Sequence, residues 1–334
     1  MIDQKQVVEA LMNPRAYDEE AISIEMIQTH ISYVFLTGNF VYKVKKAIDL
    51  GFLDFTTLEK RRFFCQNELE LNRRLCKGMY LEVVPINKSN SIKIRGKGET
   101  IEYAVKMKQM PQETIMSKLL EENKIDKKII DRIAKIVAKF HSKAKTDRRI
   151  SEFGNVSIET NWTENFEQTE EFIGKTISRR DYSLTREKIE GFMKTNEPLF
   201  EKRTMESRIR DCHGDIHSGN IFVTNGIYIF DAIEFNERIR YTDVAADVGF
   251  LAMDLDFRGR PDLSSFFVKK YVKYSGDEDL MNVLAFYKCY RAYVRGKVIS
   301  LKLKDLNVEE EEKIQGAKEA KAYFKLAVAY AGTL

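Results

Sequence analysis

A short polar segment carries the residues best suited to chemistry. It runs from His213 to Asp231 and contains Asp215 and Asn220. Carboxylate and amide oxygens suit Mg²⁺, which binds them together with waters and phosphate oxygens. In phosphoryl transfer, metal ions neutralise the phosphate charge while a separate carboxylate orients the attacking oxygen. We therefore predict that Asn220 and Asp231 hold Mg²⁺ and that Asp215 meets a substrate hydroxyl as the base.

The dipeptide Asn225-Gly226 predicts how the metal ligands converge. It lies between two apolar runs and is typical of a two-residue type I′ hairpin turn, in which both residues have positive φ. Such a turn places Asn220 opposite Asp231 on the two strands. Directly opposed residues have Cβ atoms about 4.5–5.5 Å apart. The hairpin register thus predicts that both oxygen donors lie side by side.

The surrounding pattern predicts two lobes. From about residue 22 to residue 46 the pattern is β-like and predicts three antiparallel strands, and residues 56–77 have helical spacing. We expect an α+β fold with an N-terminal lobe, 1–108, and a larger, mainly helical lobe, 109–334. Further strands are predicted at 81–86, 91–94 and 102–107, and helices at 126–145, 163–204, 244–257, 262–275, 278–303 and 309–331.

Composition excludes several classes of protein. Hydrophobic residues make up 43% and charged residues 32%, as in a folded globular protein. Lys and Arg total 55 against 51 for Asp and Glu, which is too balanced for a nucleic-acid-binding face. No apolar run approaches the roughly 20 residues that cross a bilayer, and no secretory signal is evident. With four scattered cysteines, we expect a cytoplasmic protein without membrane or nucleic-acid partners; the oligomeric state stays open.

The motifs resemble a known family. Asp-x₄-Asn followed by a strand Asp resembles the catalytic loop and metal aspartate of the protein-kinase-like fold. The form HGDxHxxN, residues 213–220, is similar to aminoglycoside phosphotransferases and choline kinases, which phosphorylate small molecules. Other segments resemble an uncharacterised bacterial family within that branch, whose members often carry a P-loop domain; we find no P-loop motif in this sequence. These segments are Phe35–Gly38, Tyr42–Lys46, Gly51–Phe55 and Tyr290–Arg295.

The resemblance implies a bilobal kinase-like fold, with ATP and Mg²⁺ as cofactors and a small-molecule hydroxyl as acceptor. Kinases hold the phosphates with a strand lysine paired to a helix glutamate. Strand alternation puts Lys43 on one face with Val41, and Lys45, which shares that face, stays open as an alternative. Glu68 is the predicted partner because apolar residues three and seven positions later place it on the inward edge; Glu70 is the second choice.

The same resemblance implies further nucleotide contacts. Lys108 and Met110 would belong to the hinge whose backbone contacts adenine, and His217 would reach phosphate or substrate. Two departures from the family pattern stand out. Residues 28–32 occupy the place of a glycine-rich loop, and the sequence after Asp231 is not the usual Asp-Phe-Gly, which leaves the role of Glu234 open.

Alternative functions follow from the same residues. The missing glycine-rich loop favours a nucleotide-binding regulatory module, or pseudokinase, without turnover. A protein Ser/Thr kinase is less favoured because Gly214 replaces the arginine typical of that branch. The run His213-x-Asp215-x-His217 could also hold Zn²⁺ or Fe²⁺.

Two further groups of residues have predicted roles. Asp243 and Asp247 are expected to be buried, with an aspartate at this place anchoring the catalytic loop. Tyr287, Arg291 and Arg295 recur along one helix face, where the arginines either bind an anionic substrate or form a solvated or intramolecular salt-bridged face.

Overall fold

The computed structural model describes residues 4–334 except 22, 52, 306 and 307, and only the backbone of Asn155. Residue 22, which begins the predicted strands, and Phe52, in one of the family-like motifs, lie outside the described residues. The chain divides into two compact units. Unit 1 comprises Met1–Ile115 and Asn220–Glu237, and unit 2 comprises Met116–Gly219 and Arg238–Leu334. The lobe boundary expected after Lys108 stays a prediction.

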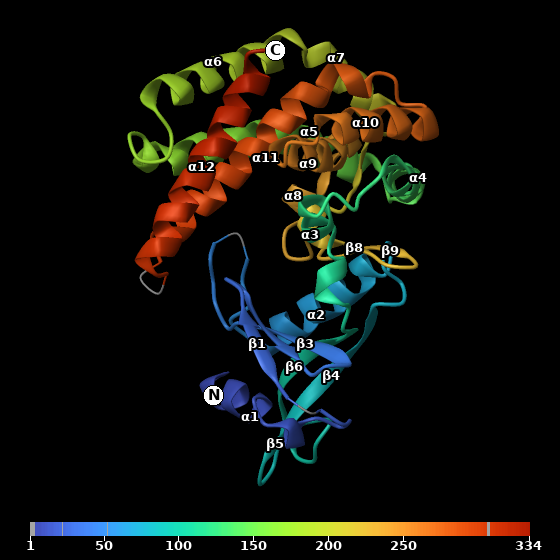
Figure 1. Cartoon of the computed structure of the whole chain (residues 1–334), viewed down its shortest axis with the longest axis vertical. Coiled ribbons are helices and arrows are strands. Elements are labelled where there is room, and N and C mark those ends of the chain that lie inside the picture. Colours follow the sequence, from blue (N-terminus) through green and yellow to red (C-terminus); the bar gives the residue numbers. More distant parts are fainter. Residues whose placement is uncertain (1–3, 22, 52, 306–307) are drawn as a thin grey trace. The chain divides into compact units, whose positions relative to one another are not determined.

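Unit 1 is built on an antiparallel six-stranded sheet with the strand order β1-β2-β3-β6-β4-β5 (Figure 1). The predicted three-strand meander, the helix and the later strands are confirmed. The strands are β1 (Glu25–Gln28), β2 (Ser32–Leu36), β3 (Phe40–Lys45), β4 (Tyr80–Lys88), β5 (Ile92–Ile94) and β6 (Glu99–Lys108). The unit also contains α1 (Gln4–Leu11), η1 (Pro14–Ala16), α2 (Leu58–Asn72), η2 (Gln112–Thr114) and the small hairpin β8 (Ile221–Val223) and β9 (Ile227–Ile229).

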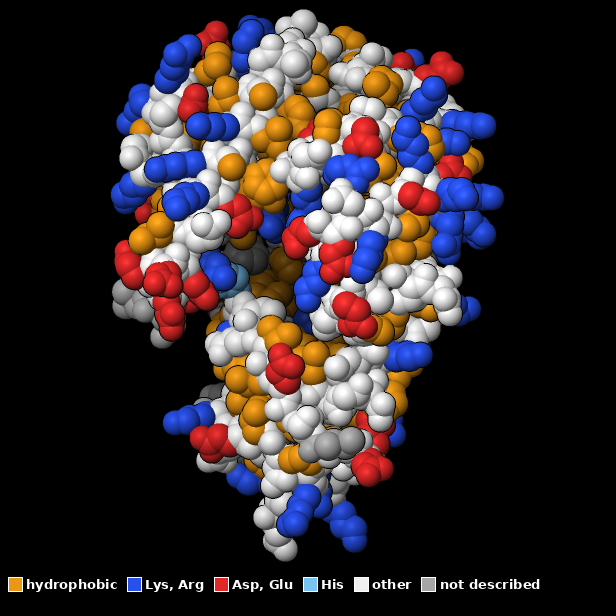
Figure 2. Space-filling model, viewed as in Figure 1, with side chains coloured by type: hydrophobic (Ala, Val, Ile, Leu, Met, Phe, Trp, Pro, Cys, Tyr) orange, Lys and Arg blue, Asp and Glu red, His pale blue; other side chains and the backbone are white. Residues whose placement is uncertain are grey.

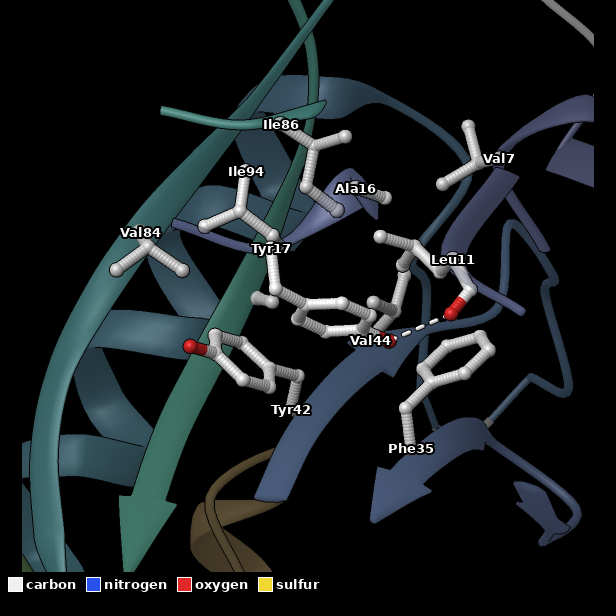
Figure 3. Packing of buried hydrophobic residues seen from close by; sticks show 11 residues of the cluster. Val7, Leu11, Ala16, Tyr17, Phe35, Tyr42, Val44, Val84, Ile86 and Ile94 are labelled. Carbon is white, nitrogen blue, oxygen red and sulfur yellow. Dashed lines mark hydrogen bonds between the residues drawn. The ribbon is translucent and has the colours of Figure 1, made fainter. Parts of the chain in front are cut away.

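The two faces of this sheet have different partners. On one face Tyr42 and Val44 of β3 pack with Leu11 of α1 and with Tyr17, whose hydroxyl donates to the Leu11 carbonyl (Figure 3). On the other face Val41 packs with Cys65 and Leu69 of α2. Because strand residues alternate between faces, Lys43 and Lys45 of β3 face α2 together with Val41. Helix α1, which the sequence pattern did not predict, covers the face away from these lysines.

Unit 2 is mainly helical (Figure 1). The helices predicted from residue 126 onward are present, although the stretch predicted as helical from 163 to 204 is divided among three helices, the first of which already begins at residue 148. The α-helices are α3 (Met116–Glu121), α4 (Lys127–Lys143), α5 (Arg148–Thr169), α6 (Arg179–Thr195), α7 (Glu197–Met205), α9 (Val244–Phe257), α10 (Pro261–Ser275), α11 (Leu280–Lys302) and α12 (Glu310–Ala331). The remaining elements are η3 (Glu170–Phe172) and the antiparallel pair β7 (Ile209–Asp211) and β10 (Tyr241–Asp243); η4 (Ser218–Asn220) and α8 (Glu237–Arg240) each span a junction between the units.

Local sequence explains several helix starts in unit 2. Asp126 caps α4 by accepting from the Ile129 amide, and Asp147 caps α5 in the same way from Ile150. Helix α9 is buried along most of its length and packs against α10 and α11, while α11 packs against α12. Trp162 of α5 stacks on Phe166, at a ring distance of 5.2 Å, and also contacts aromatic residues of α11. Helix α9 is therefore a buried, central support for the loop of residues 213–220, which precedes it in the chain.

The surface agrees with the balanced composition. Figure 2 shows Lys and Arg side chains mixed with Asp and Glu over the face that it draws. Within the described part of the chain, no helix combines the length and apolar character required to cross a membrane.

Candidate active site

The predicted strand lysine and helix glutamate come together inside unit 1. Lys43 Nζ lies 2.8 Å from Glu68 Oε1, and Lys45 Nζ lies 2.7 Å from Glu68 Oε2. Glu68 is fully buried, whereas the second-choice Glu70 is exposed. Burial disfavours the charged carboxylate, but the two lysines outweigh burial and lower the pKa of Glu68. Glu68 is therefore held ionised between both candidate lysines.

Asp231 distinguishes the two lysines. Its Oδ1 atom lies 2.7 Å from Lys43 Nζ, and its side chain is 45% exposed. Burial disfavours the Lys43 ammonium, but Asp231 and Glu68 outweigh burial and raise the pKa of Lys43. Lys43 thus joins the helix glutamate to the predicted metal aspartate. Lys45 does not contact Asp231 in the described interactions and pairs with Glu234.

The backbone of Asp231 adopts an uncommon conformation. Its φ is +64°, in the left-handed region that residues other than glycine rarely enter. A conformation of this kind costs about 1–3 kcal/mol and persists where the surrounding structure imposes it. The next residue, Ala232, donates its amide to Asn72 Oδ1 of α2 at 2.9 Å. Asn72, which the sequence reading missed, lies one helical turn after Glu68 and so belongs to the same edge of α2.

The predicted hairpin register is wrong by one residue. Ile221 pairs with Ile229 and Val223 with Ile227, so the loop holds three residues, 224–226, and Asn220 lies opposite Phe230. Neither Asn225 nor Gly226 has positive φ, as a type I′ turn would require. Thr224 instead closes the loop, since its amide donates to the Gly226 carbonyl and its hydroxyl accepts from the Gly226 amide. The local dipeptide signal missed these bonds.

Asn220 and Asp231 nonetheless lie at the same end of this hairpin. The Phe230 amide donates to the Asn220 carbonyl at 3.0 Å, which extends the ladder to the residue before Asp231. Asn220 is buried and Asp231 is partly exposed. A carboxylate and an amide that flank the two strands of one hairpin fit Mg²⁺ in donor chemistry, because this ion prefers hard oxygen ligands. Which oxygens would bind the ion stays a prediction.

Glu234 forms a second buried ion pair in unit 1. It contacts Lys45, with side-chain exposures of 3% for Glu234 and 0% for Lys45. Burial raises the pKa of Glu234, and repulsion from Glu68 contributes to the rise against the attraction of Lys45. Burial also opposes the charge of Lys45, but Glu234 and Glu68 outweigh it and raise the pKa of the ammonium. Glu234, whose role the sequence left open, is thus part of the lysine–glutamate cluster.

Asp215 lies in unit 2, on a loop held by its backbone. Asp247 of α9 accepts from the amides of His213 and Gly214, at 2.8 and 2.9 Å. Asp254, also of α9, accepts from the Ser218 amide at 2.9 Å. The expected anchoring of this loop is confirmed for Asp247.

Asp243, by contrast, serves another contact. It forms a buried ion pair with Arg203, which also binds Asp277. This three-residue group was missed from sequence, because Arg203 lies on α7 and Asp277 lies in the loop between α10 and α11, far apart in the chain and without a distinguishing local motif.

The side chain of Asp215 is partly exposed, at 29%, and lies near basic side chains. His217 Nε2 is 3.5 Å from its Oδ2 atom. Burial opposes ionisation of Asp215, but His217, Arg295 and Arg291 outweigh burial and lower the pKa of the carboxyl. An ionised carboxylate at neutral pH suits a residue that orients a hydroxyl and accepts its proton late, because the transition state is loose.

The two loop histidines have different surroundings. His213 Nδ1 accepts from the Asp215 amide at 3.3 Å, in keeping with the expected supporting role. His217 Nδ1 accepts from the Gly219 amide, and its ring lies 5.2 Å from that of Phe250. The contact of His217 with phosphate or substrate stays a prediction.

The alternative metal run gains no support from the described residues. In that part of the chain, the group whose ligand atoms lie within 4.8 Å of one another is His141, Cys212 and Asp247. Asp247 already accepts the two loop amides, and His141 Nδ1 bonds the Tyr271 hydroxyl at 2.8 Å. Asp247 thus holds the loop to α9, and His141 links α4 to α10 and to Asp247.

The predicted hinge residues and the helix face that carries Arg291 and Arg295 each make contacts within their own unit. The Lys108 amide donates to the Met79 carbonyl at 2.8 Å, and Met110 is buried while the Lys108 side chain is exposed. Arg291 is buried and donates to the Ala246 carbonyl at 3.2 Å. Arg291 Nη2 also lies 4.0 Å from Asp247 Oδ1, so the contacts of Arg291 match the intramolecular salt-bridged alternative. Adenine binding by the hinge stays a prediction.

Comparison with known proteins places the chain in a family. Residues 90–285 match the model of the phosphotransferase enzyme family (APH). Uncharacterised proteins of Mycobacterium tuberculosis and Mycobacterium bovis are 32% identical over 277 residues, which cover 82% of this chain and 54% of theirs. The chain therefore spans about half the length of these relatives.

Solved structures show the fold. A choline/ethanolamine kinase family protein from Mesorhizobium loti has 12% identity and a TM-score of 0.54, with full coverage of both chains. A Ralstonia eutropha protein assigned as an aminoglycoside phosphotransferase has 14% identity and a TM-score of 0.51, covering 100% of this chain and 99% of its own. The predicted protein-kinase-like α+β fold is confirmed. With the family model matching more than half of its residues, the chain belongs to the phosphotransferase enzyme family.

Proposed function

We propose that this protein transfers the γ-phosphoryl group of ATP to a hydroxyl of a small molecule, with Mg²⁺ as the metal. The observation that carries the proposal is the position of Lys43, held between the buried Glu68 and the exposed Asp231. A lysine that served only in a structural ion pair would need one carboxylate partner, whereas Lys43 has two. A lysine poised between an inner glutamate and an outer metal-type carboxylate is the arrangement used to grip phosphates.

Each proposed residue has one task. Lys43 donates to phosphate oxygens and Glu68 keeps its ammonium charged and directed. Asn220 and Asp231 would hold Mg²⁺, which when bound supplies charge neutralisation on the phosphates. Asp215 orients the acceptor hydroxyl and takes its proton, while Asp247 fixes the loop through the His213 and Gly214 amides. Lys108, Met110 and His217 are the further proposed nucleotide contacts.

The acceptor must be found by experiment. The solved structures with this fold include a choline/ethanolamine kinase family protein and a protein assigned as an aminoglycoside phosphotransferase, yet a shared fold does not determine the acceptor. We propose a free hydroxyl on a small metabolite, and a small-molecule extract incubated with labelled ATP would identify it by mass spectrometry of the labelled product.

Substitution of Asp231 by alanine tests the metal assignment. Asp231→Ala should abolish Mg²⁺-dependent phosphoryl transfer, because the carboxylate is a proposed metal ligand and also the outer partner of Lys43. Asp262→Ala, which changes a 53% exposed carboxylate of α10, is the control. Turnover of Asp231→Ala at the level of the parent would rule out the assignment.

A second candidate function is a nucleotide-binding module without turnover. The tight connection between β1 and β2 favours it, since Thr29 closes that turn by accepting from the Ser32 amide at 2.9 Å and no glycine is present to approach a phosphate. Thermal shift with ATP and Mg²⁺, combined with measurement of ADP release, separates the two functions. Stabilisation by nucleotide without ADP release across hydroxyl-bearing metabolites would favour the module.

A further inference from the structure

We propose that Lys45 and Glu234 form a permanent ion pair that positions Asp231, separate from the Lys43 pair that meets the ligand. The inference rests on the proposed function, because it concerns how the metal carboxylate is held. Lys45 and Glu234 are positioning residues, which act on the nucleotide site only through Glu68 and the segment 231–234.

The two carboxylate oxygens of Glu68 pair with different lysines. Glu68 Oε1 lies 2.8 Å from Lys43 Nζ, and Glu68 Oε2 lies 2.7 Å from Lys45 Nζ. The remaining partner of Lys43 is Asp231, and the remaining partner of Lys45 is Glu234. The order along the cluster is therefore Asp231, Lys43, Glu68, Lys45, Glu234. Both ends belong to one four-residue segment, which closes the cluster into a ring.

Exposure separates the two lysines. The side chain of Lys43 is 11% exposed and its outer partner Asp231 is 45% exposed, whereas Lys45 is 0% exposed. The Lys45 ammonium also lies 5.0 Å above the ring of Phe55, an arrangement that favours a cation. The cluster is therefore open to solvent at its Asp231 end, beside Lys43, whereas Lys45 is enclosed. Lys45 therefore keeps Glu68 paired when Lys43 directs its hydrogen bonds to a phosphate.

Glu234 transmits this restraint to Asp231. The segment from Asp231 to Glu234 lies outside helices and strands, and its first residue has a φ of +64°. Helix α2 holds it at three points. Asn72 accepts from the Ala232 amide, Asn67 donates to the Glu234 carbonyl at 3.3 Å, and Glu68 reaches the Glu234 side chain through Lys45. Loss of the contact that runs from Glu68 through Lys45 to Glu234 would leave the backbone conformation of Asp231 less constrained.

The experiment measures how strongly Mg²⁺ increases ATP affinity in the full chain. Isothermal titration calorimetry gives the Kd of ATP in Mg²⁺ and in EDTA, and the ratio of the two values reports the metal site. The test variant is the double substitution Lys45→Met/Glu234→Leu, because replacing a buried ion pair by apolar side chains often preserves stability. Glu234→Gln is the second variant, which keeps a hydrogen-bond acceptor for Lys45 but removes the charge.

A matched control is available in the same unit. Arg61 of α2 and Glu102 of β6 form another buried ion pair, with the Arg61 Nε atom 2.8 Å from Glu102 Oε2. It joins α2 to the sheet, and the other described partners of Arg61 are the carbonyls of Phe55 and Thr56, outside residues 231–234. Arg61→Met/Glu102→Leu therefore removes a comparable pair and reports the effect of weakening the unit in general. Melting of each variant without nucleotide shows whether it is folded.

The expected result is specific to the metal effect. Lys45→Met/Glu234→Leu should lower the Mg²⁺ enhancement of ATP affinity about tenfold, equivalent to about 1.4 kcal/mol, with the Kd in EDTA unchanged. Glu234→Gln should lower the same ratio by less, and Arg61→Met/Glu102→Leu should not change it. An unchanged ratio in folded Lys45→Met/Glu234→Leu or in Glu234→Gln overturns the inference and leaves the proposed function standing. A parent protein that binds no ATP overturns both.

Discussion

The support of the catalytic loop by Asp247 leads to a quantitative prediction for Asp247→Asn. Asp247 is fully buried, and its two oxygens accept the Gly214 and His213 amides at 2.9 and 2.8 Å. An asparagine of the same shape offers one acceptor oxygen and one NH₂ group. One backbone N–H would then face another donor, and the remaining bond would lose its charge.

The magnitude follows from these lost bonds. A buried group left without a partner costs about 1–3 kcal/mol, and a hydrogen bond to a charged group contributes about 1.5–3 kcal/mol. We expect Asp247→Asn to lower the free energy of unfolding by about 3–5 kcal/mol. For a unit of about 200 residues, this corresponds to a fall in Tm on the order of 10 °C. Loop mobility should also reduce turnover.

The pH dependence has a definite sign. Burial opposes ionisation of Asp247, but His141, His213 and Arg291 outweigh burial and lower the pKa of its carboxyl. A lowered pKa stabilises the fold above the unfolded-state pKa of about 3.9, and this contribution is lost as the pH falls through the folded-state pKa. The free energy of unfolding of the parent should therefore exceed that of Asp247→Asn by the whole amount near neutral pH. This difference should decrease in acid.

Calorimetry and amide hydrogen exchange check this prediction. Exchange at the His213 and Gly214 amides should accelerate in Asp247→Asn, because these are the groups that it leaves without a carboxylate. Asp262→Asn is the matched control, since its side chain is 53% exposed and surface changes usually stay within about 0.5 kcal/mol. A loss of less than about 1 kcal/mol in Asp247→Asn, or unchanged exchange, would refute the reasoning.

Three further predictions concern single charges. Lys43→Met should lower turnover about 10²–10³-fold, the cost of removing one stabilising donor; steady-state kinetics with wild-type rates would contradict its role. Arg295→Met should raise the pKa of Asp215, which Arg295 helps to lower after His217, so the acid limb of the turnover profile should move to higher pH, and an unmoved limb would disprove the coupling. Arg203→Met should cost about 3–5 kcal/mol in urea unfolding, because two buried aspartates lose their cation; near-parental stability would contradict this.

The sequence alone determined the faces and spacings of the proposed site. Alternation along β3 put Lys43 and Lys45 on one face, and helical spacing put Glu68 on the buried edge of α2, as the structure has them. These features depend on the periods of strands and helices, which act over a few residues. The family resemblance of the segment from His213 to Asn220 is likewise evident from its amino-acid sequence alone.

Tertiary structure decided the contacts between distant segments. Lys43 and Lys45 are equivalent in local pattern, and only the packing of segment 231–234 on α2 gives Asp231 to one and Glu234 to the other, across 188 and 189 positions of the chain. The hairpin register followed hydrogen bonds of Thr224 and not the Asn-Gly signal. Such contacts depend on which surfaces meet when the sheet, helices and loops pack together, and no local period in the chain encodes that choice.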